Sequence, residues 1–181
     1  MSGLPGSGKS TLAKLLAERL GLRYVSSGML FRKLAKERGM DLLEFSRLAE
    51  KDYSIDKMID AMALEEGKKG CVVVDGHIAG WILKDVATAK IYLYAPQDVR
   101  ALRIAGRDGK GFEDALAEVR AREESEARRF KAIYGIDVRD IGVFDIAINT
   151  STYGIEETFE LALEAIKKSL EKLKDRANKQ G

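Results

Sequence analysis

The stretch that decides the fold is Gly3–Ser10, GLPGSGKS, which fits the pattern G-x-x-x-x-G-K-[ST] at every position. Glycines let the backbone turn tightly and bring its N–H groups close to a polyphosphate. The segment that follows, 9–20 (KSTLAKLLAERL), carries leucines at helical spacing and predicts a helix whose positive N-terminus points at the same anion. The stretch therefore predicts a phosphate-binding loop at the head of a helix.

Within this loop, Lys9 is expected to reach the β- and γ-phosphates of ATP, and the Ser10 hydroxyl is expected to ligate Mg²⁺. A chance glycine-rich turn is the alternative interpretation, but the helical pattern that follows at once favours phosphate binding. The residues that we expect to bind ATP are Gly3, Gly6, Ser7, Gly8, Lys9, Ser10 and Thr11.

A buried β-strand normally precedes such a loop, and only Met1 and Ser2 precede Gly3. We therefore expect the first strand to be missing from this chain, which would leave a parallel sheet without its central strand. The interpretation that we favour is that the start of the coding sequence has been assigned too far downstream. The alternative is that this protein lacks the strand.

Downstream of the loop, strand and helix patterns alternate. The run Cys71–Val74 (CVVV) is typical of a strand buried on both faces of a parallel sheet, and Cys71 is expected to be a small buried apolar residue. This alternation predicts a three-layer α/β fold with a parallel sheet and right-handed crossovers. Further strands are expected at 24–26, 90–95 and 144–148, and helices at 29–38, 42–51, 55–67, 97–108, 112–131 and 155–175.

Composition limits the class of protein. A length of 181 residues fits one domain, and 31 basic against 29 acidic residues leaves less positive charge than a dedicated nucleic-acid binder usually has. One cysteine and one histidine exclude an intramolecular disulfide and a multi-histidine metal site. No apolar run is long enough to span a bilayer. We expect a cytoplasmic monomer without nucleic-acid or membrane partners; the few asparagines and glutamines suggest a thermophilic source.

Further segments in the chain narrow the function. Ser26–Arg32 (SSGMLFR) follows the second expected strand, Val73–Trp81 (VVDGHIAGW) follows the third, and Arg122–Asp137 lies in an arginine-rich excursion. In this order, and behind the phosphate loop, these segments resemble the cytidylate kinase family, most closely its archaeal type. The resemblance runs from Gly3 to about the end of the last helix. The phosphate loop alone is not specific to that family, whereas the S-G-x-x-[FY]-R, D-G-x-x-x-G and Y-G-I-D segments are much more so.

The resemblance implies a nucleoside monophosphate kinase built as a single P-loop kinase domain over residues 1–181. Within it, residues 27–67 would form the monophosphate-binding segment, and residues 109–140 an arginine-rich helical lid. The implied reaction is phosphoryl transfer from ATP to CMP, with dCMP also accepted, which gives ADP and CDP or dCDP.

Several positions match functional residues of that family. Arg122 and Arg129 match lid arginines and are expected to be catalytic together with Lys9. His77 stands where bacterial relatives usually have an arginine, a stronger phosphate clamp, and Tyr94 stands where they usually have an aspartate. The substitution at His77 leaves the contact with the acceptor phosphate undecided, and the one at Tyr94 leaves the recognition of the acceptor's base undecided. The residues expected at the acceptor site are Ser27, Phe31, Arg32, Asp75, Gly76 and His77.

The chemistry requires positioning and charge neutralisation. A phosphomonoester is already anionic near neutral pH, since its second pKa is about 6, so no strong general base is needed. Arg32 is expected to hold the acceptor phosphate as a bidentate fork, and Asp75, at a strand end, to hold Mg²⁺ through a water. Closure of the lid would also exclude water. The arginines expected to neutralise the transferring group are Arg122, Arg129 and Arg128, with Arg103 and Arg107 at the base of the lid.

Structural interpretations of the same residues remain open. The arginines within 100–131 alternate with glutamates and could form solvated ion pairs along a helix face. His77 could cap a helix or bond the backbone, and Phe31 could belong to the core. The alternatives for function are a kinase for AMP, dTMP or a nucleoside, and a nucleotide-binding regulator that acts on RNA or a protein partner and phosphorylates nothing.

Overall fold

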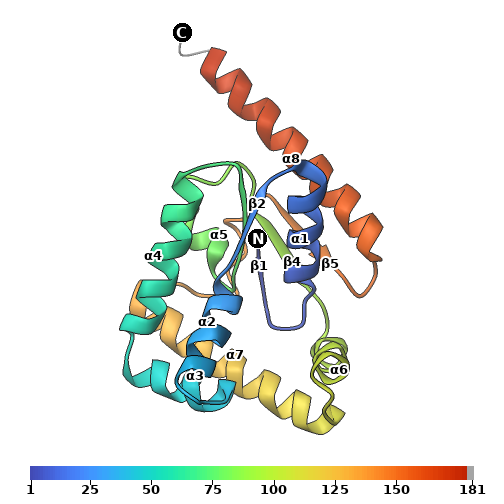
Figure 1. Cartoon of the computed structure of the whole chain (residues 1–181). Coiled ribbons are helices and arrows are strands. Elements are labelled where there is room, and N and C mark those ends of the chain that lie inside the picture. The colour runs from blue at the N-terminus through green and yellow to red at the C-terminus, as the bar shows by residue number, and fades with distance from the viewer. Residues whose placement is uncertain (179–181) are drawn as a thin grey trace.

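A computed structural model describes residues 1–178, in which parallel strands alternate with helices as the sequence predicts (Figure 1). The strands are β1 (Ser2–Gly3), β2 (Arg23–Ser26), β3 (Val72–Asp75), β4 (Ile91–Tyr94) and β5 (Ile146–Asn149). The helices are α1 (Lys9–Leu20), α2 (Ser27–Glu37), α3 (Leu42–Lys51), α4 (Ser54–Lys68), α5 (Ala79–Ile82), α6 (Gln97–Asp108), α7 (Phe112–Tyr134) and α8 (Ile155–Asn178).

The sheet is parallel throughout and contains the strand that we expected to be missing. β2 pairs with β3, and β4 lies between β1 and β5. Met1 joins these two sets, because its amino group donates to the Val74 carbonyl at 2.7 Å and its own carbonyl accepts from the Gly76 N–H at 3.1 Å. The expectation of an absent first strand is therefore corrected: Ser2–Gly3 form a two-residue strand that pairs with β4, next to the bonds of Met1 with the end of β3.

Apolar layers on both faces of the sheet confirm the three-layer arrangement. The leucines of α1 that recur at helical spacing pack against the sheet, and Leu12 and Leu16 are buried. Each such side chain removed from water contributes about 2 kcal/mol to folding. The other members of this cluster come from β4, β5 and α8: Ile91, Leu93, Ile148, Phe159 and Ala162. The opposite face is covered by a second cluster, Ala63, Val74, Ala79 and Leu83.

Two local features differ from the sequence-based expectation. The helix α5 has four residues, too few to give a helical repeat in the sequence, and its Trp81 packs edge-to-face on Phe144 with ring centroids 4.8 Å apart. Cys71 is exposed and adopts a left-handed φ of 48°, next to Gly70 at 72°. The expected burial of Cys71 is therefore wrong, because this residue belongs to the turn before β3 and not to the strand.

The helices outside the sheet layers gather at one end of the molecule, where α2, α3, α6 and α7 lie in Figure 1. The segment 27–67 has a small core of its own around Phe45. In the segment 109–140, Ala115 and Val119 of α7 pack on Ile104 of α6. Motion of either segment stays a prediction. No helix within residues 1–178 has the length and apolarity to cross a membrane.

Candidate active site

The loop between β1 and α1 has a shape that requires glycine. Gly3, Gly6 and Gly8 have φ values of 146°, 79° and 87°. A Cβ on Gly3 would lie 2.1 Å from the carbonyl oxygen of Leu93, and one on Gly6 would lie 2.6 Å from that of Arg100. The loop thus lies directly against β4 and α6, and its backbone can approach a ligand closely.

The start of α1 is open to an anion. Gly8 supplies no side-chain cap, and the first turn carries no acidic residue, so the first N–H groups of the helix have no side-chain partner. The Lys9 ammonium lies against the loop, where it donates to the Leu4 carbonyl at 2.9 Å. Burial lowers the pKa of Lys9 to about 8, against the opposing effect of Asp75 and Glu126. This arrangement fits a phosphate group.

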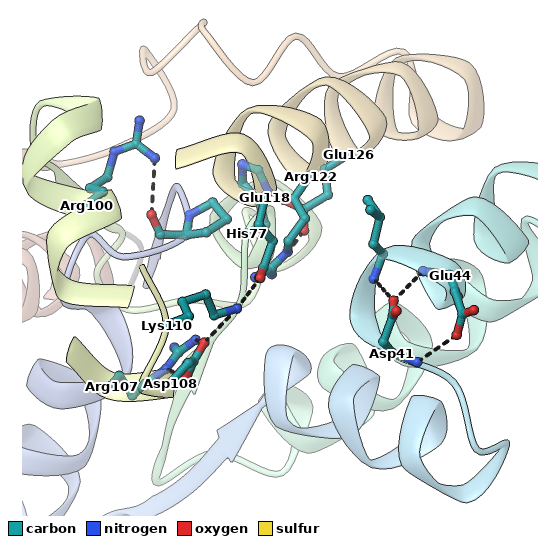
Figure 2. Close-up of polar contacts among 12 residues, drawn as sticks. Asp41, Glu44, His77, Arg100, Arg107, Asp108, Lys110, Glu118, Arg122 and Glu126 are labelled. Atoms are coloured by element: carbon teal, nitrogen blue, oxygen red, sulfur yellow. Dashed lines mark hydrogen bonds and ion pairs between the residues drawn. The ribbon is translucent and has the colours of Figure 1, made fainter. Parts of the chain in front are cut away.

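Two arginines of α6 tie this loop to the body of the protein. Arg100 is 3% exposed and donates to the Pro5 carbonyl at 3.1 Å (Figure 2). It also pairs with Glu123. Arg103 donates to the Gly6 carbonyl at 3.3 Å. The sequence predicts Arg103 at the base of the lid but gives no sign of a role for Arg100, because nothing local in it indicates that α6 lies beside the loop.

The loop opens into a cleft of about 1060 Å³ that contains most of the predicted site. Of the residues expected to bind ATP, all but Ser7 line it; Ser7 is fully buried, and its Oγ has no hydrogen-bond partner. Arg103 and Arg107 also line the cleft, at the positions expected to add positive charge. Of the residues expected at the acceptor site and on the lid, the cleft is lined by Arg32, Asp75, Gly76, His77 and Arg122.

Asp75 is held rigidly in the floor of this cleft. It is 1% exposed, and its two oxygens accept from the Ser26 hydroxyl at 2.6 Å and the Tyr24 hydroxyl at 2.9 Å. Both hydroxyls come from β2, where Ser26 lies in register with Asp75. Within residues 1–178, no group of three or more His, Cys, Asp or Glu side chains could hold a metal ion. Magnesium usually keeps several waters and binds through one or two carboxylates together with substrate phosphates.

A second, smaller pocket continues from the cleft between α2, α4 and α7. Five residues line both spaces, and they mark the place where the two pockets meet: Gly28, Arg32, His77, Arg122 and Glu126. The remaining residues of the smaller pocket are Ser27, Phe31, Asp56, Ile59, Asp60, Ile78, Arg129 and Phe130. Ser27 and Phe31, both predicted from the sequence, therefore lie on the side of the junction away from the phosphate loop. Phe31 also packs edge-to-face on Phe45 at 4.7 Å, so it belongs to the core and to the pocket wall.

The junction concentrates positive charge that lacks a full set of partners. Burial lowers the pKa of the Arg32 guanidinium below its usual range, and the nearby positive charges of Arg107 and Arg122 lower it further. Arg122 lies 3.6 Å from Glu118 and 3.6 Å from Glu126, and its buried Nε has no partner. Such a place favours an anion.

His77 has a partner that the sequence did not indicate. Its Nδ1 contacts the carboxylate of Glu126, which projects from α7 into the junction. Burial alone would raise the pKa of Glu126, but His77 and then Arg122 and Arg129 hold it at about 2. The Nε2 atom of His77 is buried without a partner. The structure thus favours neither a helix cap nor a backbone bond for this histidine.

Two further lid arginines lie away from the large cleft. Arg129 is 2% exposed, and its guanidinium bonds Asp56 at 2.7 Å and Ser125 at 2.6 Å beside the smaller pocket. A contact of Arg129 with a transferring phosphoryl group would require this buried pair to open. Arg128 points to solvent and pairs with Glu50 at 2.9 Å, which is the solvated ion pair of the alternative interpretation.

Ion pairs connect the base of the lid with the junction. Figure 2 shows this chain of charges, which starts at the end of α6 and runs along one face of α7. Its members are Arg107, Asp108, Lys110, Glu118, Arg122 and Glu126. Part of the arginine-rich pattern is therefore an ion-pair network, but one that ends inside the site.

Comparison with known folds defines the class of protein. The structure matches a solved, uncharacterised protein from Eubacterium ventriosum with a TM-score of 0.69 and 18% identity, over 92% of this chain and 95% of the other. It matches a gluconokinase from Sinorhizobium meliloti with a TM-score of 0.64 and 19% identity, over 97% and 94%. A family model described as an AAA domain matches residues 2–120. The fold and the loop are those of a P-loop kinase.

Sequence relatives identify the family within this class. Curated cytidylate kinases from Ignicoccus hospitalis and Aeropyrum pernix are each 50% identical, over 160 and 168 residues. The alignments cover 88% and 93% of this chain, and 93% and 98% of those proteins. A cytidylate kinase from Pyrobaculum islandicum is 49% identical over 166 residues, 92% of this chain and 90% of that protein. This chain belongs to the cytidylate kinase family, which confirms the resemblance drawn from its motifs.

Proposed function

We propose that this protein transfers the γ-phosphoryl group of ATP to CMP, with dCMP as a second acceptor, and so produces ADP and CDP or dCDP. One observation carries the proposal: the phosphate-loop cleft and the smaller pocket meet at Arg32 and Arg122, in a chain about half identical to cytidylate kinases. A kinase needs this arrangement, because donor and acceptor phosphates must be held in contact with water excluded.

On the donor side, the triphosphate of ATP lies along the loop. The N–H groups at the start of α1 bind the phosphates, and Lys9 neutralises the β- and γ-phosphates. The lowered pKa of Lys9, caused first by its burial, supports this role, since an anion that binds beside a partly buried ammonium stabilises its charge. Arg103 and Arg107 supply further positive charge to the wall of the cleft.

On the acceptor side, Arg32 holds the phosphate of the monophosphate as a fork, and Ser27 adds a hydroxyl. His77 and Gly76 close this site from the β3–α5 side, and Phe31 lies against the nucleoside. The phosphomonoester is anionic at neutral pH and attacks directly, so a general base is not required. Burial of the Arg32 guanidinium lowers its pKa, and the charges of neighbouring arginines lower it further. This lowered pKa supports an anion as the partner of Arg32.

Arg122 is our candidate for neutralising the charge that spreads over the transferring group, because it lies at the junction with an unpaired Nε. Arg129 remains a second candidate only if the lid segment 109–140 moves enough to break its pair with Asp56. Closure of that lid over the segment 27–67 would exclude water and protect ATP from hydrolysis.

The oxygen donors near the loop fit a magnesium ion bound through the nucleotide. Mg²⁺ prefers oxygen ligands in octahedral geometry and usually keeps several waters. Ser10 would ligate it directly, and Asp75, whose oxygens already accept two hydroxyl groups, would hold a bound water. When bound, the ion would neutralise charge on the β- and γ-phosphates.

The cellular setting follows from the substrates. ATP and CMP are small nucleotides of the cytoplasm, so we place the enzyme there as a monomer that needs neither nucleic acid nor a membrane. Size-exclusion chromatography with light scattering tests the oligomeric state; a stable dimer would contradict it.

An ADP-release assay with ATP and each of CMP, dCMP, UMP and AMP tests the proposed function. We expect the highest kcat/KM for CMP, a comparable value for dCMP, and a kcat/KM about a thousandfold lower for a Lys9→Ala variant. Turnover of AMP equal to or greater than that of CMP would contradict the choice of acceptor. Binding of ATP without any turnover would favour the nucleotide-dependent regulator.

A further inference from the structure

The smaller pocket contains two carboxylates that the proposed chemistry does not use. Asp56 and Asp60 lie one turn apart on α4, are 5% and 8% exposed, and both line the pocket. Asp56 is engaged by the guanidinium of Arg129 at 2.7 and 3.4 Å. Asp60 accepts a single hydrogen bond, from the Tyr134 hydroxyl at 2.8 Å. The buried guanidinium of Arg129 lies near both carboxylates, but it forms hydrogen bonds with Asp56 only.

The charge on Asp60 is poorly compensated by the side chains around it. Burial raises its pKa to about 7, and the negative charge of Asp56 adds to the effect, while Tyr134 and Arg129 oppose it only in part. A buried acceptor in this state is stabilised by any ligand that brings an N–H donor to it without bringing another acceptor.

The side chains that line the pocket favour a flat, mostly apolar ligand. Apolar side chains surround the polar end, and two of them are aromatic rings: Phe31, Ile59, Ile78 and Phe130. An apolar slot with a few polar groups at its end suits a flat heterocycle. The slot opens from the junction that would hold the acceptor phosphate.

We propose that Asp60 accepts a hydrogen bond from the exocyclic amine of the acceptor's pyrimidine and so selects an aminopyrimidine over an oxopyrimidine nucleotide. This inference rests on the proposed function, because it needs a pyrimidine monophosphate in the smaller pocket. Cytosine offers an N–H₂ donor where uracil offers a carbonyl oxygen, which would face the Asp60 carboxylate as a second acceptor. Asp56 acts as a positioning residue that keeps Arg129 beside the same base.

The direct test is an Asp60→Asn variant, which keeps the size of the side chain but presents a donor as well as an acceptor. We expect the ratio of kcat/KM for CMP to that for UMP to fall at least about tenfold, since one unsatisfied buried polar group costs about 1–3 kcal/mol. Glu65→Gln on the exposed side of the same helix is the matched control and leaves the ratio unchanged. A ratio unchanged in Asp60→Asn overturns the inference.

A second measurement needs no variant. The ionised form of Asp60 only accepts hydrogen bonds, whereas its protonated form can also donate to a uracil carbonyl. The CMP-to-UMP ratio of the unmodified enzyme should therefore rise between pH 6 and pH 8, around the Asp60 pKa of about 7. The acceptor phosphate titrates alike in CMP and UMP and cancels from the ratio. The other titratable or charged groups that line the pocket or face Asp60 are Arg32, Asp56, His77, Arg122, Glu126, Arg129 and Tyr134.

The two proposals fail in different ways. An unmodified protein that does not phosphorylate CMP would contradict the proposed function. An unmodified protein that prefers CMP, with a ratio that is flat between pH 6 and pH 8, would contradict only the assignment of Asp60.

Discussion

The two nucleotide-binding regions of this protein are built in different ways. The donor loop is made of backbone: three glycines at positive φ, two of which lie directly against β4 and α6, and the first turn of one helix. The acceptor pocket is made of side chains from α2, α4 and α7. A backbone site requires a contiguous stretch of sequence, whereas a side-chain site can be assembled from residues far apart in the chain. The predictions below test this contrast from each side.

Loss of the loop's one ammonium group should have the largest effect on activity. Lys9→Ala removes the charge that faces the β- and γ-phosphates, and we expect kcat/KM to fall by about a thousandfold. Rates of ADP release measure the effect, and circular dichroism should show an unchanged fold. A fall of less than tenfold would mean that the loop backbone alone suffices.

Glycine should be required in the loop for steric reasons and not only for its φ. Gly3→Ala would place a Cβ 2.1 Å from a carbonyl oxygen of β4, and we expect a loss of about 3 kcal/mol in the free energy of unfolding. Gly39→Ala is the control, because Gly39 has a φ of 66° but no atom within 4 Å of its Cβ position. It should lose about 1 kcal/mol. Equal losses in urea unfolding would show that the close approach to β4 has no influence.

Asp60 in the acceptor pocket should make the free energy of unfolding depend on pH. Asp60 has a pKa of about 7 in the folded protein and an ordinary value of 3.8, so the folded state binds the extra proton between these values. Its contribution to stability is present below about pH 4 and is lost as the pH rises through 7. Asp60→Asn should therefore be more stable than the unmodified protein at pH 8, on the order of 3 kcal/mol, with a smaller difference at pH 5. Urea unfolding at both pH values measures this, and a constant difference would contradict it.

Removal of the acceptor fork should affect one substrate only. We expect Arg32→Ala to raise the KM for CMP about 10- to 100-fold, because charge-assisted hydrogen bonds contribute about 1.5–3 kcal/mol, and to leave the KM for ATP nearly unchanged. Steady-state kinetics with each substrate varied in turn measures the split. Equal effects on both KM values would place Arg32 in a shared structural role, and no effect on either would remove it from the acceptor site.

The smallest effect is expected for the arginine that points away from both pockets. Arg128 is 63% exposed in its side chain and pairs with Glu50 and Glu124 on the surface. Arg128→Ala should change kcat/KM less than about twofold and stability by less than about 1 kcal/mol. A large loss of activity would mean that the lid rearranges enough to bring Arg128 into the site.

This contrast also explains how far the sequence could predict the site. The loop, the helix after it and the alternation of strands with helices were readable, since each depends on a contiguous pattern. The two-residue strand β1 was not, because its place depends on its pairing with β4 and on the hydrogen bonds of Met1 with the end of β3 rather than on its length. The pair Arg129–Asp56 joins residues 73 apart in sequence, and Glu126 reaches His77 across 49. Only the packing of α7 against the rest of the fold brings these groups together.

If the cleft and the smaller pocket hold two nucleotides whose phosphates meet at Arg32 and Arg122, a molecule that joins adenosine to cytidine through a polyphosphate bridge should occupy both. We predict that it inhibits competitively against both ATP and CMP, and that Lys9→Ala and Arg32→Ala each weaken its binding in isothermal titration calorimetry. Competition with ATP alone, with binding unaffected by Arg32→Ala, would contradict the account.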